Sequence, residues 1–143
     1  MKNTWRFNGN EYKYLQEVIS GHMISSTSGN MNQRFEKEFA KYCGLKYAIT
    51  FNSGTSTLHA ALHACDVHAG DEVIVPPLTV ISNVDVIFAQ GAVPVFCDVD
   101  PSTWNMCPKK TEKLITNKTK AIMPVSLYGL SVDLEEFREL SIK

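Results

Sequence analysis

Four short apolar segments, separated by helix-like stretches, constrain the fold of this chain more than any other feature of its sequence. Two of their cores, Val73-Ile74-Val75 and Ala121-Ile122-Met123, are continuously apolar and do not alternate with polar residues. Strands with this pattern are covered on both faces, as in a parallel sheet with helices on each side. The sequence therefore predicts an α/β fold of three layers, αβα, with a mainly parallel sheet. The predicted strands are 47–51, 72–76, 93–99 and 120–125, and the helices that follow them are 55–65, 79–89, 109–115 and 133–140.

The stretch before the first predicted strand contains helical and loop-like sequence. Apolar residues at helical spacing predict one helix from Asn8 to Ile19 and a second around 35–42, with Gly44 as its C-cap. The polar segment 25–30 predicts a loop between them. We divide the chain into an N-terminal helix and loop over 1–34 and a partial large domain over 35–143. We expect the sheet to be incomplete, because the last predicted helix is not followed by a closing strand.

Composition and charge exclude several classes of function. A net charge of −1 over 143 residues gives no electrostatic footprint for nucleic acid or for an anionic membrane surface. No apolar run approaches a membrane span and no signal-type segment follows the first residues, so we expect a cytoplasmic protein. His59 and His63 have a spacing that can place two metal ligands on one helix face. No further ligand follows at a zinc-type spacing, so the sequence predicts no metal site.

The segment from Asn52 to His59 joins a predicted strand to a predicted helix and is rich in hydroxyl groups. Gly54 lets the backbone turn sharply and lets a ligand come close. Ser53 or Thr55 can cap the helix, whose first N–H groups have no partner within it. A strand, a Gly/Ser/Thr turn and a helix N-terminus together can form a phosphate site. An ordinary capped helix fits these residues equally well, and the segment by itself leaves both interpretations open.

Several sequence blocks occur in a fixed order along nearly the whole chain. The first includes Phe35-Glu36 and Tyr42-Cys43-Gly44, and the second is the Asn52–His59 segment. In this ordered series the chain resembles the DegT/DnrJ/EryC1/StrS family of sugar aminotransferases. The family uses pyridoxal phosphate (PLP) on the fold type I scaffold, so the resemblance implies the same cofactor and fold. The remaining blocks are Gly70-Asp71-Glu72-Val73-Ile74-Val75-Pro76, Thr79, Gly91-Ala92-Val93-Pro94-Val95-Phe96, Asp98-Val99-Asp100-Pro101, Thr119-Lys120-Ala121-Ile122 and Leu127-Tyr128-Gly129.

The resemblance assigns roles to a few positions. Gly54 and Thr55 match the pair that holds the cofactor phosphate, next to Ser53. The position after Thr79 usually carries an aromatic ring that stacks on the cofactor. Here that residue is Val80, which can pack on the ring but offers less contact area and no π-stacking. We predict Ser53, Gly54, Thr55 and Val80 as the cofactor-binding residues.

The resemblance also implies that two catalytic groups lie beyond Lys143. They are the acidic residue that pairs with the pyridine nitrogen and the Schiff-base lysine, and PLP chemistry needs both. Lysines such as Lys110 and Lys120 lie in polar helix and turn segments and are predicted to be solvated. The family's common His-Leu-Tyr-Gly block begins with Ser126 in this chain. We therefore predict no catalytic residue within the 143 residues.

Three interpretations of function follow. The first is an N-terminal fragment of a PLP-dependent nucleotide-sugar aminotransferase of polysaccharide biosynthesis. The intact enzyme would move an amino group from an amino-acid donor to a keto-deoxysugar, and the fragment would be inactive alone. The second, which Val80 and Ser126 favour, is a non-catalytic relative that binds PLP, a nucleotide sugar or a full-length partner subunit. The third is a generic α/β domain with a phosphate site. Because family members are generally dimers, the resemblance implies a homodimer or a complementing chain.

Overall fold

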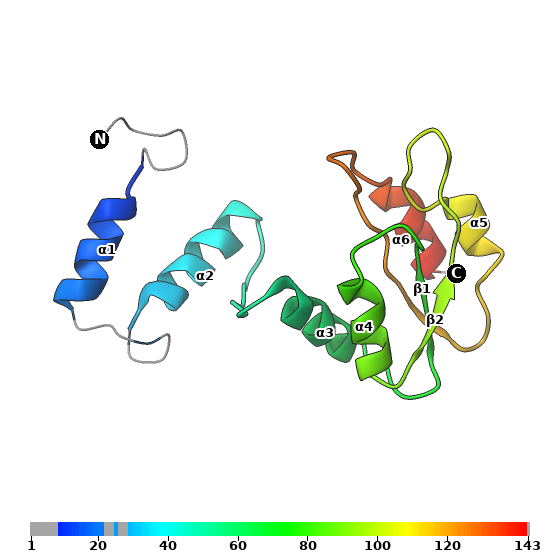
Figure 1. The fold of residues 1–143 in the computed structure, drawn as a ribbon, viewed down its shortest axis with the longest axis horizontal. Coiled ribbons are helices and arrows are strands. Elements are labelled where there is room, and N and C mark those ends of the chain that lie inside the picture. Colours follow the sequence, from blue (N-terminus) through cyan, green and yellow to red (C-terminus); the bar gives the residue numbers. More distant parts are fainter. Residues whose placement is uncertain (1–8, 22–24, 26–28, 143) are drawn as a thin grey trace. The chain divides into compact units, whose positions relative to one another are not determined.

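The computed structural model describes residues 9–21, 25 and 29–142 (Figure 1). Contacts between residues divide the chain into two compact units, Met1–Thr50 and Phe51–Lys143. Within the described residues, no helix combines the length and the apolar character that crossing a membrane requires.

A parallel sheet of three strands forms the centre of the second unit. Its strands are β1 (Glu72–Val75), β2 (Val93–Phe96) and β3 (Thr119–Ile122), in the spatial order β2-β1-β3. Both neighbours of β1 run parallel to it. The central strand is the most buried of the three, and Val73, Ile74 and Val75 are completely buried, as expected for a strand covered on both faces.

Helices α3 (Gly54–Ala64) and α4 (Ser82–Ala89) cover one face of this sheet. Because side chains alternate along a strand, Val73 and Val75 point to this face. They pack in one core cluster with residues of the two helices and of the adjoining loops. This cluster consists of Leu62, Val67, Val73, Val75, Val86, Ile87 and Ala92.

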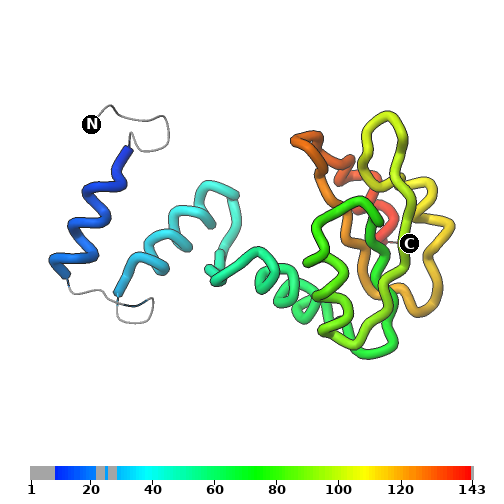
Figure 2. The backbone as a smooth tube through the Cα atoms, viewed as in Figure 1, coloured from blue at the N-terminus to red at the C-terminus, as the bar shows by residue number. Residues whose placement is uncertain are grey.

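Helices α5 (Pro108–Glu112) and α6 (Leu134–Ile142) contact each other, and α6 packs on β3. The side chain of Ile74 points to this face and lies in a second cluster with Cys97, Met106, Val132, Phe137 and Leu140. The tube in Figure 2 follows the chain through these two layers of helices. The predicted three-layer αβα arrangement is confirmed.

The strand predicted at 47–51 is wrong, because the structure has no strand there. The backbone is irregular, and the side chains of Tyr47, Ile49 and Phe51 are exposed. An apolar, β-branched segment becomes a strand only where another strand accepts its backbone hydrogen bonds. Within the described chain, no strand pairs with this segment. Within the first unit, Thr50 anchors this segment, because its N–H and hydroxyl both donate to Glu36 Oε1 at 2.8 Å.

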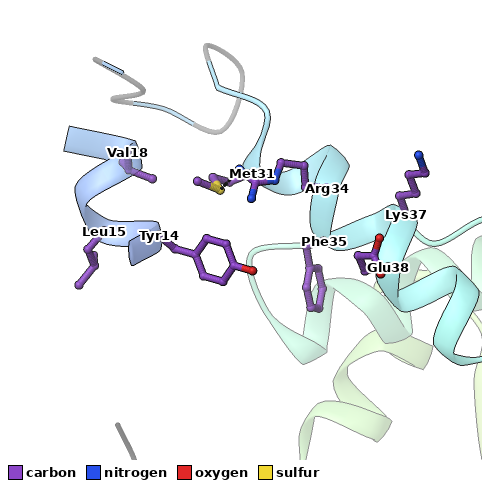
Figure 3. Close-up of a pocket in the computed structure, with 8 residues that line it drawn as sticks. All are labelled: Tyr14, Leu15, Val18, Met31, Arg34, Phe35, Lys37 and Glu38. Carbon is purple, nitrogen blue, oxygen red and sulfur yellow. Dashed lines mark hydrogen bonds between the residues drawn. The ribbon is translucent and has the colours of Figure 1, made fainter. Parts of the chain in front are cut away.

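The described residues of the first unit include two helices, α1 (Glu11–Ser20) and α2 (Met31–Tyr42). The predicted start of the first helix, Asn8, lies outside the described residues, as do 26–28 of the predicted loop. Arg34 of α2 forms an ion pair with Glu17 of α1, and its guanidinium lies 5.4 Å from the ring centroid of Tyr14. Figure 3 shows Arg34 and Tyr14 among the residues that line a cavity of about 740 Å³ between the two helices.

Candidate functional site

The N-terminus of α3 is capped by the side chain of Ser53. Ser53 has an extended backbone, and its Oγ accepts a hydrogen bond from the N–H of Ser56 at 3.1 Å. Its carbonyl oxygen accepts from the N–H of Thr57 at 3.2 Å and also from the hydroxyl of Thr57. The Ser56 hydroxyl donates to Asn52 Oδ1 at 2.7 Å. Of the two capping residues that the sequence offered, the structure uses Ser53.

The first two N–H groups of α3, those of Gly54 and Thr55, have no hydrogen-bond partner among the described residues. Both residues are exposed, as are Asn52 and Ser53 before them. Free N–H groups at a helix N-terminus carry partial positive charge and attract an anion. The local geometry can therefore accept a phosphate oxygen without breaking any hydrogen bond of the cap.

Glycine at position 54 contributes open space and not an unusual backbone conformation. Gly54 is not among the residues with positive φ, so its backbone conformation by itself does not require glycine. A Cβ atom built on Gly54 would meet no atom within 4 Å. The absence of a side chain leaves the backbone N–H accessible, which is the second role that a glycine can have in a phosphate site.

The loop that leaves the carboxyl end of β1 contains the predicted ring-packing residue. Val80 is 67% exposed, and the next residue, Ile81, is exposed to a similar degree. Thr79 Oγ1 is buried and has no hydrogen-bond partner in the described structure. Unpaired buried hydroxyl groups are rare in folded proteins and call for an explanation. In open α/β sheets, ligands bind beyond the carboxyl ends of the strands, so this loop is at the expected edge of the sheet.

The loop after β3, which carries the Ser126-Leu127-Tyr128-Gly129 block, is held by two side chains. Ser126 Oγ accepts a hydrogen bond from the N–H of Val132 at 3.2 Å. The buried side chain of Asn105 bonds to both ends of the turn, accepting from the N–H of Leu127 and donating to the carbonyl of Leu130. Asn105 is not predictable from the sequence, because its partners lie more than twenty residues along the chain and no local pattern indicates such a contact.

Two of the predicted solvated lysines lie in exposed ion pairs. Lys110 Nζ lies 3.0 Å from Asp98 Oδ2, and Lys120 Nζ lies 3.4 Å from Asp66 Oδ2. The hydrogen bond from Lys110 lowers the pKa of Asp98, and the same bond raises the pKa of Lys110. A raised pKa keeps the amine protonated, whereas a lysine that reacts as a nucleophile needs a lowered one.

His59 and His63 line a shallow cavity of about 400 Å³ on the surface of the second unit. Phe51, Ser56, Ala60 and Gln90 complete its lining. In the part of the chain that the structure describes, no three His, Cys, Asp or Glu side chains are grouped to hold a metal ion.

A family profile described as the DegT/DnrJ/EryC1/StrS aminotransferase family matches residues 6–143. GDP-perosamine synthase of Caulobacter vibrioides is 48% identical over 136 residues, which are 95% of this chain and 36% of that protein. The spore coat polysaccharide biosynthesis protein SpsC of Bacillus subtilis is 45% identical over 125 residues, 87% of this chain and 32% of that protein. The chain thus spans about a third of the length of these curated relatives.

The chain also covers about a third of each solved structure that it resembles. The aminotransferase of Psychrobacter cryohalolentis superimposes with a TM-score of 0.88 at 37% identity, covering 98% of this chain and 36% of that one. The 3-amino-5-hydroxybenzoic acid synthase gives a TM-score of 0.90 at 33% identity, with 98% and 37% covered. NtdA of Bacillus subtilis, solved with bound cofactor PMP, gives 0.85 at 34% identity, with 92% and 30% covered. The profile match, the relatives and the fold agree, and the chain belongs to the DegT/DnrJ/EryC1/StrS aminotransferase family.

Proposed function

We propose that this chain is the phosphate-binding part of a PLP-dependent nucleotide-sugar aminotransferase. The observation that carries the proposal is the open N-terminus of α3, where the N–H groups of Gly54 and Thr55 are free among the described residues and exposed. It coincides with the positions that the family resemblance assigns to the cofactor phosphate. Both lines of reasoning, one from hydrogen bonds and one from resemblance, select the same residues.

The residues present at the α3 terminus fit a phosphate group. Ser53 caps the helix through Ser56, so its hydroxyl stays engaged while the N–H groups of Gly54 and Thr55 remain available as donors. The open space at Gly54 lets a phosphate oxygen reach the backbone. When bound, PLP would supply the electron sink for amino transfer. The chain's own contribution would be to fix the phosphate and thereby orient the ring.

Val80 and Thr79 are the residues that we assign to the cofactor ring. The exposed side chain of Val80 is available to pack on an aromatic face. Thr79 precedes Val80, and its buried hydroxyl has no hydrogen-bond partner among the described residues. A bound ligand at this loop could supply that partner. Valine gives less contact area than the family's aromatic residue, so we expect weak cofactor binding by this chain alone.

The substrates are inferred from the relatives. Two of them are named GDP-perosamine synthase and dTDP-3-amino-3,6-dideoxy-alpha-D-galactopyranose transaminase. We propose that the intact enzyme acts on a nucleotide-linked keto-deoxysugar with an amino acid as donor, in the cytoplasm. We further propose that 1–34 is an N-terminal helix and loop and 35–143 part of the PLP-binding large domain. A homodimer or a complementing chain would complete the site.

A second candidate function is a non-catalytic protein of aminotransferase descent. It would bind PLP, a nucleotide sugar or a full-length partner subunit. Val80 and Ser126 favour it, because each differs from the residue that the family commonly has at its position. In the structure the hydroxyl of Ser126 holds the loop, because it accepts a hydrogen bond from the N–H of Val132.

Binding of pyridoxamine 5′-phosphate to a Gly54→Ala variant tests the proposal. The added methyl group meets no atom within 4 Å and sits where the backbone is unstrained, so the variant should fold as stably as the original chain. The methyl group would occupy the approach to the free N–H groups, and we expect affinity to fall about tenfold, which is about 1.4 kcal/mol. Isothermal titration calorimetry measures the affinity, and pyridoxamine without the phosphate is the control ligand. Equal affinity of both proteins for pyridoxamine 5′-phosphate would overturn the assignment.

A further inference from the structure

Two exposed aromatic residues in the second unit have a backbone conformation that side chains rarely adopt. Trp104 has φ +62 and Tyr128 has φ +51, and the only other non-glycine residue with positive φ in the described chain is Asp66. For a bulky residue this conformation is unfavourable and persists only where the surroundings impose it. Trp104 is 52% exposed and Tyr128 is 84% exposed, so burial does not explain the strain.

A single buried amide connects the two aromatic residues. Asn105 follows Trp104 directly, and only 5% of its surface is exposed. Its Oδ1 accepts from the N–H of Leu127 at 2.9 Å and its Nδ2 donates to the carbonyl of Leu130 at 3.0 Å. Leu130 N–H also donates to the carbonyl of Leu127 at 3.0 Å. Tyr128 is thus a central residue of a turn that Asn105 fixes at both ends.

The loop that carries Trp104 is equally well fixed. The N–H of Trp104 donates to the carbonyl of Asp100 at 2.7 Å, and the N–H of Asp100 donates to the carbonyl of Asn105 at 2.9 Å. The carboxylate of Asp100 accepts from the N–H and the hydroxyl of Ser102. These bonds keep both aromatic side chains on rigid loops, which reduces the entropy lost when a ligand binds.

The two loops leave the carboxyl ends of the two outer strands of the sheet, on either side of β1. The loop with Trp104 follows β2 and the loop with Tyr128 follows β3, and Figure 1 draws them, in yellow-green and orange, at one end of the unit. This is the edge at which open α/β sheets bind ligands. Thr103 and Asn105 flank Trp104 in sequence, and Leu127 and Gly129 flank Tyr128.

We propose that Trp104 and Tyr128 form an aromatic surface, held in place by Asn105, that stacks on the nucleobase of a nucleotide-linked sugar. The inference rests on the proposed function, because it names where that substrate would bind. Stacking on aromatic side chains accepts any base, since every base has a π-face. Asn105 is a positioning residue in this account, because it contacts the turn and not the ligand.

The test uses the fluorescence of Trp104 in the full 143-residue chain. The chain has two tryptophans, Trp5 and Trp104, so a Trp5→Phe background makes Trp104 the single reporter. GMP and dTMP should each quench its fluorescence saturably, whereas mannose 1-phosphate, which lacks a base, should not. Tyr128→Ala should weaken GMP binding about tenfold, in line with the loss of one stacked ring, and Tyr128→Phe should preserve it.

Control variants separate this surface from the phosphate site and from a structural effect. Tyr42→Ala removes an equally exposed tyrosine from the first unit and should leave GMP binding unchanged. Tyr128→Ala should not change the affinity for pyridoxamine 5′-phosphate, and Gly54→Ala should not change the response to GMP. Asn105→Ala should weaken GMP binding as Tyr128→Ala does, with circular dichroism reporting whether the unit stays folded.

Several outcomes would overturn the inference. Quenching by mannose 1-phosphate as strong as that by GMP would overturn it, and so would unchanged GMP binding in Tyr128→Ala. A Tyr128→Ala variant that loses self-association but still binds GMP would also overturn it. The last would mark the surface as a protein contact. Failure of pyridoxamine 5′-phosphate to bind, with GMP quenching intact, would instead contradict the proposed phosphate site and leave the base-binding surface standing.

Discussion

At the scale of single residues, two neighbouring side chains at the start of α3 differ in their hydrogen bonds. Ser53 holds the helix together, because its Oγ accepts from the N–H of Ser56. Thr55 is exposed, and no hydrogen bond of its side chain to a described residue is observed. One residue therefore stabilises the helix, and the other remains available to a ligand.

Substitutions at Ser53 and Thr55 should affect different properties, the first stability and the second ligand binding. Ser53→Ala removes the cap and should lower the free energy of unfolding by about 1 kcal/mol. Thr55→Val keeps every observed bond of the cap and should leave stability unchanged while it weakens binding of pyridoxamine 5′-phosphate. Urea denaturation and calorimetry measure the two quantities. A loss of stability in Thr55→Val as large as in Ser53→Ala would contradict this division of tasks.

The carboxylate of Glu36 should make the first unit sensitive to acid. The hydrogen bonds from Thr50 N–H and Oγ1 lower the pKa of Glu36, because they favour the charged form. A folded-state pKa below the unfolded value contributes stability above the unfolded pKa, and that stability is lost as pH falls through the folded pKa. We expect the NMR signal of the Thr50 amide to shift at a pH below the usual glutamate pKa of about 4.3.

Two variants check the origin of that titration. Glu36→Gln should abolish it, whereas Glu38→Gln, a charge change two residues away on the same helix, should leave it in place. If the Thr50 amide still titrates in Glu36→Gln, another carboxylate is responsible.

At the scale of elements, the sequence predicted the strands whose partners the chain contains and failed where a partner is missing. The apolar runs around Val73, Val95 and Ala121 lie in one sheet because each finds a parallel neighbour within the chain. The run at 47–51 has equal β character, yet it is irregular and exposed. Strand formation depends on contacts that propensity does not contain. The role of Asn105 was unpredictable for the same reason, since its partners are distant in sequence.

The unpaired segment 45–49 should cause the chain to associate. Leu45, Tyr47 and Ile49 place exposed apolar side chains at every second position, the pattern of a strand that lacks its neighbour. Size-exclusion chromatography should show a mass that rises with protein concentration. The double variant Tyr47→Lys/Ile49→Lys should suppress this rise, and Asn32→Lys/Gln33→Lys, which adds the same charge on α2, should not. A clean monomer at high concentration would argue against an incomplete sheet.

At the scale of the whole molecule, the chain corresponds to about a third of the length of its relatives, and we propose that this third holds the phosphate of the cofactor. Lys110 and Lys120 are held in exposed ion pairs with carboxylates. A lysine that attaches a cofactor needs a neutral amine in a positioned site. In the proposed enzyme, this chain would hold the phosphate, and another polypeptide or segment would supply the chemistry.

The purified chain should have no aminotransferase activity when mixed with PLP. The family resemblance implies that the Schiff-base lysine is not among these residues, and general acid–base catalysis by a positioned group typically contributes roughly 10²–10⁴-fold. After borohydride reduction, mass spectrometry should find no stoichiometric phosphopyridoxyl label on any one lysine. A full label on a single lysine would reveal a catalytic residue within these 143 residues.

Backbone NMR can test whether the start of α3 holds the phosphate of the cofactor. Pyridoxamine 5′-phosphate should shift the amide signals of Gly54 and Thr55 more than any others, since their N–H groups are the free donors there. Pyridoxamine without the phosphate should leave them in place. Shifts that are largest elsewhere, for example in the cavity lined by Tyr14 and Arg34, or equal shifts with both ligands, would contradict the claim.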